Sequence, residues 1–85
     1  MENILVHFER NDLISLIKER FSIDEVRMDD TFKYDLLLDS LDVVELVCDV
    51  ECKIGEVIPE NVVDSFETPG DVWRYVQTRQ KELLG

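Results

Sequence analysis

Ser40 is the residue whose type and position offer the clearest chemistry. It follows a long polar stretch and opens a segment with helical apolar spacing, so its hydroxyl is expected at a loop–helix junction that another enzyme can reach. Amides at a helix N-terminus favour an attached phosphate, whereas the carboxylates of Asp39, Asp42 and Glu45 repel a free one. The pattern favours a covalent phosphoester presented to a basic partner. The alternative is that Asp39 and Ser40 only cap a helix whose acids form a solvated face.

Cys48, Cys52 and His7 offer neither a metal centre nor a catalytic pair. The cysteines are four residues apart, which matches neither a C-x-x-C redox site nor a zinc knuckle, and the single histidine is distant in sequence. The sequence has no D-x-D-x-D-G calcium loop, and no general base is evident for Ser40, which alone is a weak nucleophile. We therefore expect no catalytic residue, no metal ligand and two free, reduced thiols.

The segment around Ser40 resembles the acyl carrier protein family. Residues 39–46, D-S-L-D-V-V-E-L, match the family signature D-S-L-D-x-V-E-L at every fixed position. Residues 32–36 are similar to the F-x-x-D-L that leads into the signature, and residues 58–59 to the I-P before the short third helix. Residues 68–75 are similar to the start of the last helix. The resemblance covers roughly residues 13 to 76.

The resemblance implies a carrier that has no catalysis of its own. A phosphopantetheinyl transferase would attach 4′-phosphopantetheine from coenzyme A to Ser40, and the arm's thiol would carry an acyl group as a thioester. The carrier would then visit synthase, reductase, dehydratase and acyltransferase enzymes of fatty-acid or polyketide synthesis. The second helix is the family's usual docking face, and the docking residues expected here are Asp39, Leu41, Asp42, Glu45, Cys48, Asp49 and Glu51. The acyl pocket between the second and third helices would be lined by Leu46, Val47, Ile58, Val63 and Phe66.

Several alternatives stay open beside this interpretation. Each of the expected pocket residues can also be an ordinary residue of the hydrophobic core. The cargo can belong to another dedicated pathway, such as a D-alanyl carrier, although Asp39 argues against the G-G-x-S signature of peptidyl carriers. A third hypothesis is an acidic helix that docks partners without a prosthetic group. Leu37 and Leu38 depart from the small Gly and Ala common before the signature, which makes the loop beside Ser40 bulkier and more apolar.

Helical spacing of apolar residues predicts an all-α, acyl-carrier-like fold, an antiparallel four-helix bundle with three main helices, one short helix and one long connection. The first helix is predicted over about residues 11–21, with Asn11 as its N-cap, and residues 1–10 extend or precede it. A second helix is predicted over 40–54, capped by Asp39, with Leu46 at the edge of its buried face. A short helical turn is expected over 58–63.

The last helix is predicted over residues 69–81, with Thr68 as its N-cap and Pro69 at its first position. The polar stretch before Ser40 contains four apolar or aromatic residues expected to anchor it in the core: Val26, Met28, Phe32 and Tyr34.

Composition limits the classes of partner. The 85 residues suit one domain, and nine Lys and Arg against 20 Asp and Glu give a net charge of −11. Such a charge repels nucleic acid and anionic membranes and favours basic protein surfaces. The longest purely apolar run, residues 36–38, is far too short to span a membrane, and no signal peptide is recognisable. We expect a cytoplasmic monomer.

Overall fold

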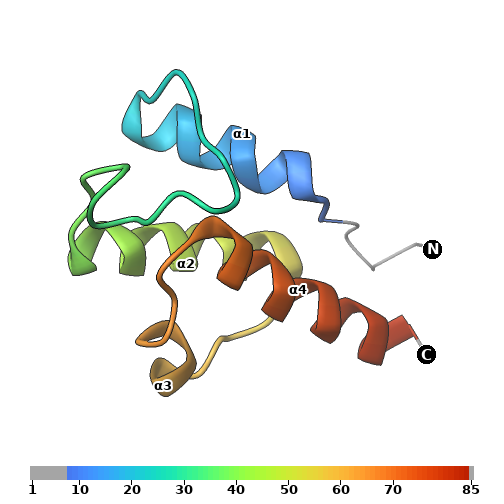
Figure 1. The fold of residues 1–85 in the computed structure, drawn as a ribbon. Coiled ribbons are helices and arrows are strands. Elements are labelled where there is room, and N and C mark those ends of the chain that lie inside the picture. The colour runs from blue at the N-terminus through green and yellow to red at the C-terminus, as the bar shows by residue number, and fades with distance from the viewer. Residues whose placement is uncertain (1–7, 85) are drawn as a thin grey trace.

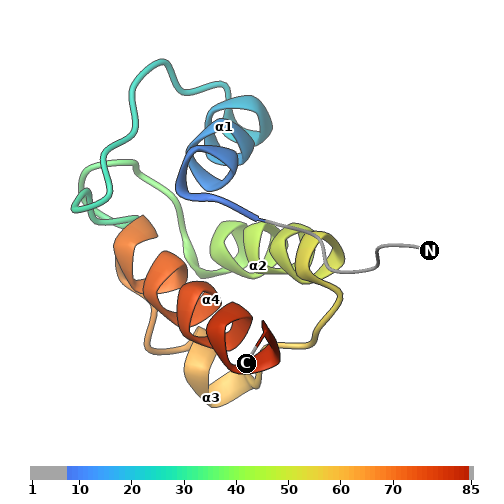
Figure 2. The same ribbon diagram turned by 90° about the vertical axis from the view of Figure 1, so that its right-hand side faces the viewer.

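The computed structural model describes residues 8–84 as four helices joined by loops, with no strand in this range. The helices are α1 (Arg10–Phe21), α2 (Ser40–Ile54), α3 (Glu60–Val63) and α4 (Pro69–Leu84). α1 runs opposite to α2, a long loop joins them, and α3 is a short turn below α2 and α4 (Figures 1 and 2). The predicted all-α fold class, with three main helices and one short one, is confirmed.

The start of α1 differs from the prediction. Asn11 is the second helical residue, so its assignment as the N-cap is wrong. Glu9, with an extended backbone, is the N-cap, and its amide donates to the Asp12 carboxylate at 2.7 Å. An acceptor three residues after the cap satisfies an amide that has no partner within the helix. Phe8 and Glu9 are not helical, and residues 1–7 lie outside the described residues.

One apolar core holds the helices together. Leu46, predicted at the edge of the buried face of α2, is fully buried, and Val43, Val47 and Val50 are buried with it. Phe8 is also buried, and its backbone exchanges hydrogen bonds of 2.9 and 3.0 Å with the Gln80 side chain of α4. The core is formed by the buried side chains of Phe8, Leu13, Ile17, Phe32, Leu38, Val43, Leu46, Val47, Val50, Ile58, Phe66, Val72 and Val76.

Three of the four residues predicted to anchor the loop between α1 and α2 reach the core. Phe32 is buried, and Val26 and Met28 pack half-buried against the core. Tyr34 is 73% exposed, so its predicted role as an anchor is wrong. Its phenol stays in water, and the Lys33 ammonium lies 5.3 Å from the ring centroid, an arrangement that favours the exposed position.

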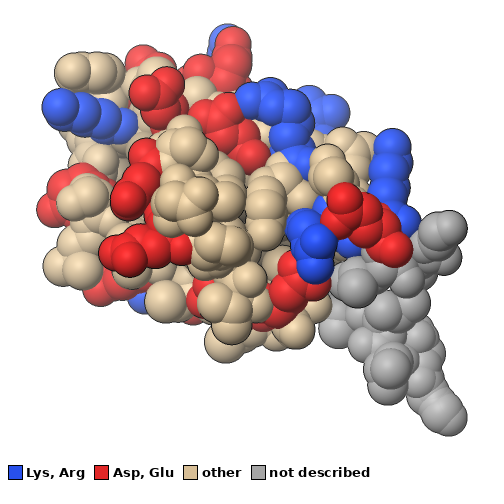
Figure 3. Space-filling view, turned by 90° about the horizontal axis from the view of Figure 1, so that it is seen from below, with Lys and Arg blue, Asp and Glu red and all other residues tan. Residues whose placement is uncertain are grey.

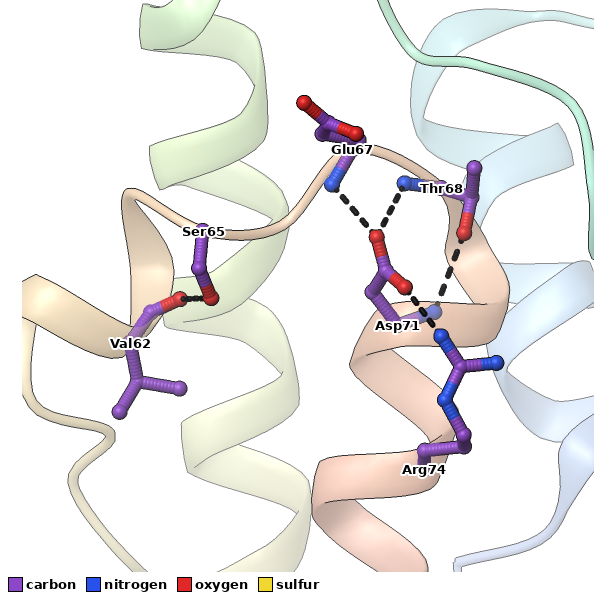
Figure 4. Close-up of polar contacts among 6 residues, drawn as sticks. All are labelled: Val62, Ser65, Glu67, Thr68, Asp71 and Arg74. Carbon is purple, nitrogen blue, oxygen red and sulfur yellow. Dashed lines mark hydrogen bonds and ion pairs between the residues drawn. The ribbon is translucent and has the colours of Figure 1, made fainter.

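The start of α4 is fixed by reciprocal hydrogen bonds (Figure 4). The Asp71 amide donates to the Thr68 hydroxyl at 3.2 Å, and the Thr68 amide donates to the Asp71 carboxylate at 3.1 Å. Thr68 therefore caps the helix as predicted, and Arg74 pairs with the same carboxylate from the next turn. α4 continues past the predicted end at Lys81 to Leu84, since strong helix formers follow with no breaker before Gly85.

Asp and Glu side chains crowd much of the surface. On the face seen from below they surround an uncharged area in the left half, whereas Lys and Arg lie mainly towards the upper and right edges (Figure 3). The carboxylates outnumber their cationic partners, so mutual repulsion opposes the compact state.

We expect added salt to stabilise the fold. Raising NaCl from about 0.01 to 0.5 M shortens the screening length from about 30 Å to a few ångström, so the melting temperature should rise by about 4–8 °C, equivalent to about 1 kcal/mol. The control is the same series near pH 4.3, the sequence pI, where the rise should be much smaller. Equal melting temperatures across the series at pH 7 would contradict the repulsion argument.

An ion pair joins the end of α2 to α4. The Arg79 Nε donates to Glu56 Oε1 at 2.6 Å, and this hydrogen bond lowers the pKa of Glu56 below its ordinary value of 4.5. A carboxyl with a lower pKa in the folded state contributes stability above its unfolded pKa and loses it as the pH falls through the folded value. Glu56→Gln should therefore lower the urea midpoint at pH 7 and have a smaller effect at pH 3, as measured by circular dichroism. An equal effect at both pH values would contradict a charge-dependent contribution from Glu56.

Candidate functional site at the start of α2

Ser40 is the first residue of α2 and is exposed to solvent. The helix is capped by its neighbours: the Asp42 amide donates to Asp39 Oδ1 at 2.9 Å, and the Asp39 amide donates to Asp42 Oδ2 at 3.1 Å. Within residues 8–84 we find no hydrogen bond to the Ser40 hydroxyl. Ser40 is therefore not a cap, and its hydroxyl is available for chemistry.

The reciprocal cap is a feature that the sequence interpretation missed. Asp39 was expected to cap α2, and it does, whereas Asp42 was expected as a docking residue and not as part of the cap. Acceptors three residues apart before an apolar helical segment are the sequence signal for a capping box. The carboxylate of Asp42 is thus committed to the helix start and is only partly exposed.

An open hollow of about 790 Å³ lies beside Ser40. The α1–α2 loop, the start of α2 and the segment that precedes α4 form its walls, and buried apolar residues form its floor. Lys33 is the one cation among its lining residues, which are Thr31, Phe32, Lys33, Tyr34, Leu37, Leu38, Asp39, Ser40, Val43, Phe66 and Glu67. A group attached to the Ser40 hydroxyl would start beside a hollow lined by apolar residues, one cation (Lys33) and two carboxylates (Asp39 and Glu67).

The expected docking residues differ in their solvent exposure. Asp39, Leu41, Glu45 and Cys48 are exposed, whereas Asp42, Asp49 and Glu51 are partly buried. Leu41 is 63% exposed, as expected for an apolar contact on the outer side of α2.

Three of the docking acids, Glu45, Asp49 and Glu51, are engaged with other parts of the fold. Arg20 of α1 pairs with Asp49 at 2.6 Å and lies 3.5 Å from Glu45. The Glu51 carboxylate accepts a hydrogen bond of 2.7 Å from the Ile58 amide and so holds the loop before α3. Nothing local in the sequence predicts contacts between residues so far apart. Asp39 and Asp42, which flank Ser40, form no ion pair within the described residues, so negative charge stays uncompensated beside Ser40.

Most of the expected acyl-pocket residues belong to the core. Leu46, Val47, Ile58 and Phe66 are buried, and Val63 is half-buried against them. Phe66 alone among them lines the hollow beside Ser40, and its ring meets that of Tyr75 edge-on at 6.2 Å between centroids.

Cys48 and Cys52 are free and exposed, as expected from their spacing. In the described range no group of three or more His, Cys, Asp or Glu side chains is arranged to hold a metal ion. None of the helices in that range is long and apolar enough to cross a membrane.

Comparison with known proteins identifies the family of this fold and site. A family profile described as "Phosphopantetheine attachment site" matches residues 11–76. An "Acyl carrier protein" of Lactobacillus johnsonii is 39% identical over 72 residues, which cover 82% of this chain and 90% of that protein. An "Acyl carrier protein" of Exiguobacterium sibiricum is 38% identical over 78 residues, which cover 92% of this chain and 95% of that protein.

The fold has a solved counterpart from Mycobacterium tuberculosis whose name includes the words acyl carrier protein. The two chains superpose with a TM-score of 0.77 at 21% identity, over 82% of this chain and 96% of the other, which shows a shared fold.

The matched residues and the helical fold together define a phosphopantetheine-attachment domain. The chain belongs to the acyl carrier protein family, and its prosthetic group is 4′-phosphopantetheine. The site fits that group, because Ser40 is exposed, lines an open, partly apolar hollow, and its hydroxyl has no hydrogen bond within residues 8–84.

Proposed function

We propose that this chain carries acyl groups as thioesters on a 4′-phosphopantetheine arm attached to Ser40. The observation that supports this best is the exposed Ser40 at the first position of α2, where Asp39 and Asp42 form the cap and the serine hydroxyl has no hydrogen bond within the described residues. When attached, the arm supplies a terminal thiol that forms and releases thioesters. The protein contributes the attachment oxygen, the surface around it and the charge that partners recognise.

The attachment step needs a base that this chain does not supply. The Ser40 oxygen attacks the β-phosphorus of coenzyme A, a new oxygen–phosphorus bond forms, and adenosine 3′,5′-bisphosphate leaves with the electrons of the broken pyrophosphate bond. The hydroxyl proton passes to a base of the phosphopantetheinyl transferase, because Asp39 and Asp42 accept each other's amides. The amides at the start of α2 would favour the negative charge of an attached phosphate.

Docking follows from the charge around Ser40. The exposed carboxylates of Asp39 and Glu45, with Leu41 between them in sequence, suit enzymes that present basic patches around an apolar contact. Such encounters are fast, salt-sensitive and weak, which suits a monomeric shuttle that must release each partner. Its proposed partners in the cytoplasm are the synthase, reductase, dehydratase and acyltransferase enzymes of fatty-acid or polyketide synthesis.

The cargo is proposed to be an apolar acyl chain. A chain that starts at Ser40 first meets the apolar floor of the hollow, which includes Phe32, Val43 and Phe66. Access to the region of Leu46 requires core side chains to move, because Leu46 is fully buried. The expected pocket therefore opens only when a chain enters it.

The test is cargo analysis of the protein isolated from its host while the pathway is active. Release by hydroxylamine followed by mass spectrometry should yield a fatty or polyketide acyl group. An amino acid on the arm would favour a D-alanyl carrier instead.

A docking module without a prosthetic group makes the opposite prediction in living cells. It requires Ser40→Ala to support the pathway while Asp42→Lys with Glu45→Lys does not. Failure of Ser40→Ala, at a normal cellular level of folded protein, excludes that module.

A further inference from the structure

Leu37 occupies a conformation that its side chain disfavours. Its backbone φ is +58°, in the left-handed region where a leucine Cβ crowds the following carbonyl and where Gly or Asn is tolerated. The side chain is apolar and 80% exposed, the most exposed large apolar side chain in the described part of the chain. Packing within the fold therefore does not account for a leucine at this position.

The backbone on both sides of Leu37 is fixed. The Leu36 amide donates to the Thr31 carbonyl at 3.0 Å, and the Leu38 amide donates to the Phe32 carbonyl at 2.7 Å. Leu38 is itself buried in the core. The exposed side chain thus projects from an ordered turn. A partner that binds it would cost this turn little backbone conformational entropy.

Leu37 and Ser40 line the same hollow, and an extended chain of three residues separates their Cα atoms by at most about 11 Å. A transferase that attaches a group to the Ser40 oxygen must approach this surface more closely than an enzyme that acts at the far end of the arm. The exposed Asp35 and Asp39 flank Leu37 in the chain. The matching surface would be an apolar recess with a basic rim.

We propose that Leu37 is a specificity residue for the host's own phosphopantetheinyl transferase, which receives its side chain in such a recess. This inference rests on the proposed attachment to Ser40. Leu37 contacts the enzyme and not the reacting atoms, so it sets which transferase binds productively and does not take part in the chemistry.

The test compares loading rates of Leu37→Asn and wild type by two enzymes, the host's transferase and a broad-specificity transferase. Asn tolerates the left-handed backbone, so this change removes apolar surface without adding strain. With the host enzyme, kcat/KM for the carrier should fall at least about tenfold, as expected when a buried leucine contact is lost. With the broad-specificity enzyme it should change by less than about threefold.

Matched variants separate recognition from folding. Val57→Asn changes an apolar side chain that is 78% exposed in the loop at the other end of α2, and it should load like wild type with both enzymes. Leu37→Met keeps the apolar contact and should stay within about threefold of wild type with the host enzyme. Leu37→Asn and Leu37→Gly should melt at or above the wild-type temperature, because both residues suit the backbone.

Two results would overturn the proposal. The first is a loss of equal size with both transferases, and the second is unchanged loading of Leu37→Asn by the host enzyme. If that unchanged loading is accompanied by faster thioester hydrolysis, Leu37 covers the cargo instead. If wild type itself gains no phosphopantetheine from the host enzyme, the attachment to Ser40 fails first, and that result is distinct from both.

Discussion

Ser40→Ala is expected to gain no phosphopantetheine from coenzyme A, magnesium and a transferase, whereas wild type gains one. The loss should be complete, because the hydroxyl oxygen is the atom that forms the bond to phosphorus and alanine offers no substitute. The helix start should survive the change, since the cap is formed by Asp39 and Asp42. Intact-mass spectrometry measures the outcome, and circular dichroism shows that the variant is folded.

Ser65→Ala is the matched control for this experiment. Ser65 is also exposed, but its hydroxyl donates to the Val62 carbonyl at 2.6 Å, within the turn after α3 (Figure 4). It should gain one phosphopantetheine at the wild-type rate. A gain on Ser40→Ala together with a loss on Ser65→Ala would move the attachment site away from α2.

Gly70→Ala is expected to destabilise the fold by about 1–3 kcal/mol, the usual range for overpacking. The Gly70 amide donates to the Met28 carbonyl at 2.8 Å, which ties the start of α4 to the α1–α2 loop. A Cβ on Gly70 would lie 2.9 Å from the same carbonyl oxygen, a backbone atom that cannot turn aside. Alanine's higher helix propensity offsets at most about 1 kcal/mol of this clash.

Urea denaturation followed by circular dichroism measures the effect. Gln77→Ala, an exposed position of the same helix, is the control and should stay within about 0.5 kcal/mol of wild type. A Gly70→Ala variant as stable as that control would show that the α1–α2 loop moves away from the added methyl group without a loss of stability.

Local signals were sufficient to predict the element that carries Ser40. The bounds of α2, its Asp39 cap and its buried valines follow from neighbouring residues, because caps and helical periodicity depend on separations of three or four positions. The same holds for Thr68 as the cap of α4. The exposed serine at the start of a helix was predictable for this reason.

Contacts between distant segments were not predictable in the same way. The pairing of Arg20 with Asp49 joins residues 29 positions apart, and the sequence had suggested an uncompensated acid stripe. Tyr34 was expected in the core, but its loop turns the ring outward. The left-handed backbone of Leu37 also had no signal, because leucine is not typical of that conformation.

The hollow beside Ser40 was predictable only in part, because contacts between distant segments form it. Phe66 was among the residues expected to meet an acyl chain, whereas the loop residues Lys33 and Leu37 were not assigned to any cavity. They reach it because the α1–α2 loop folds over the start of α2, which depends on the burial of Phe32 and Leu38.

The most direct test of the central claim is the intact mass of folded wild-type protein after incubation with coenzyme A, magnesium and the host's own transferase. We expect the gain of one phosphopantetheine, located by fragmentation to Ser40. An unchanged mass on protein shown to be folded, with a transferase shown to be active on another carrier, would contradict it.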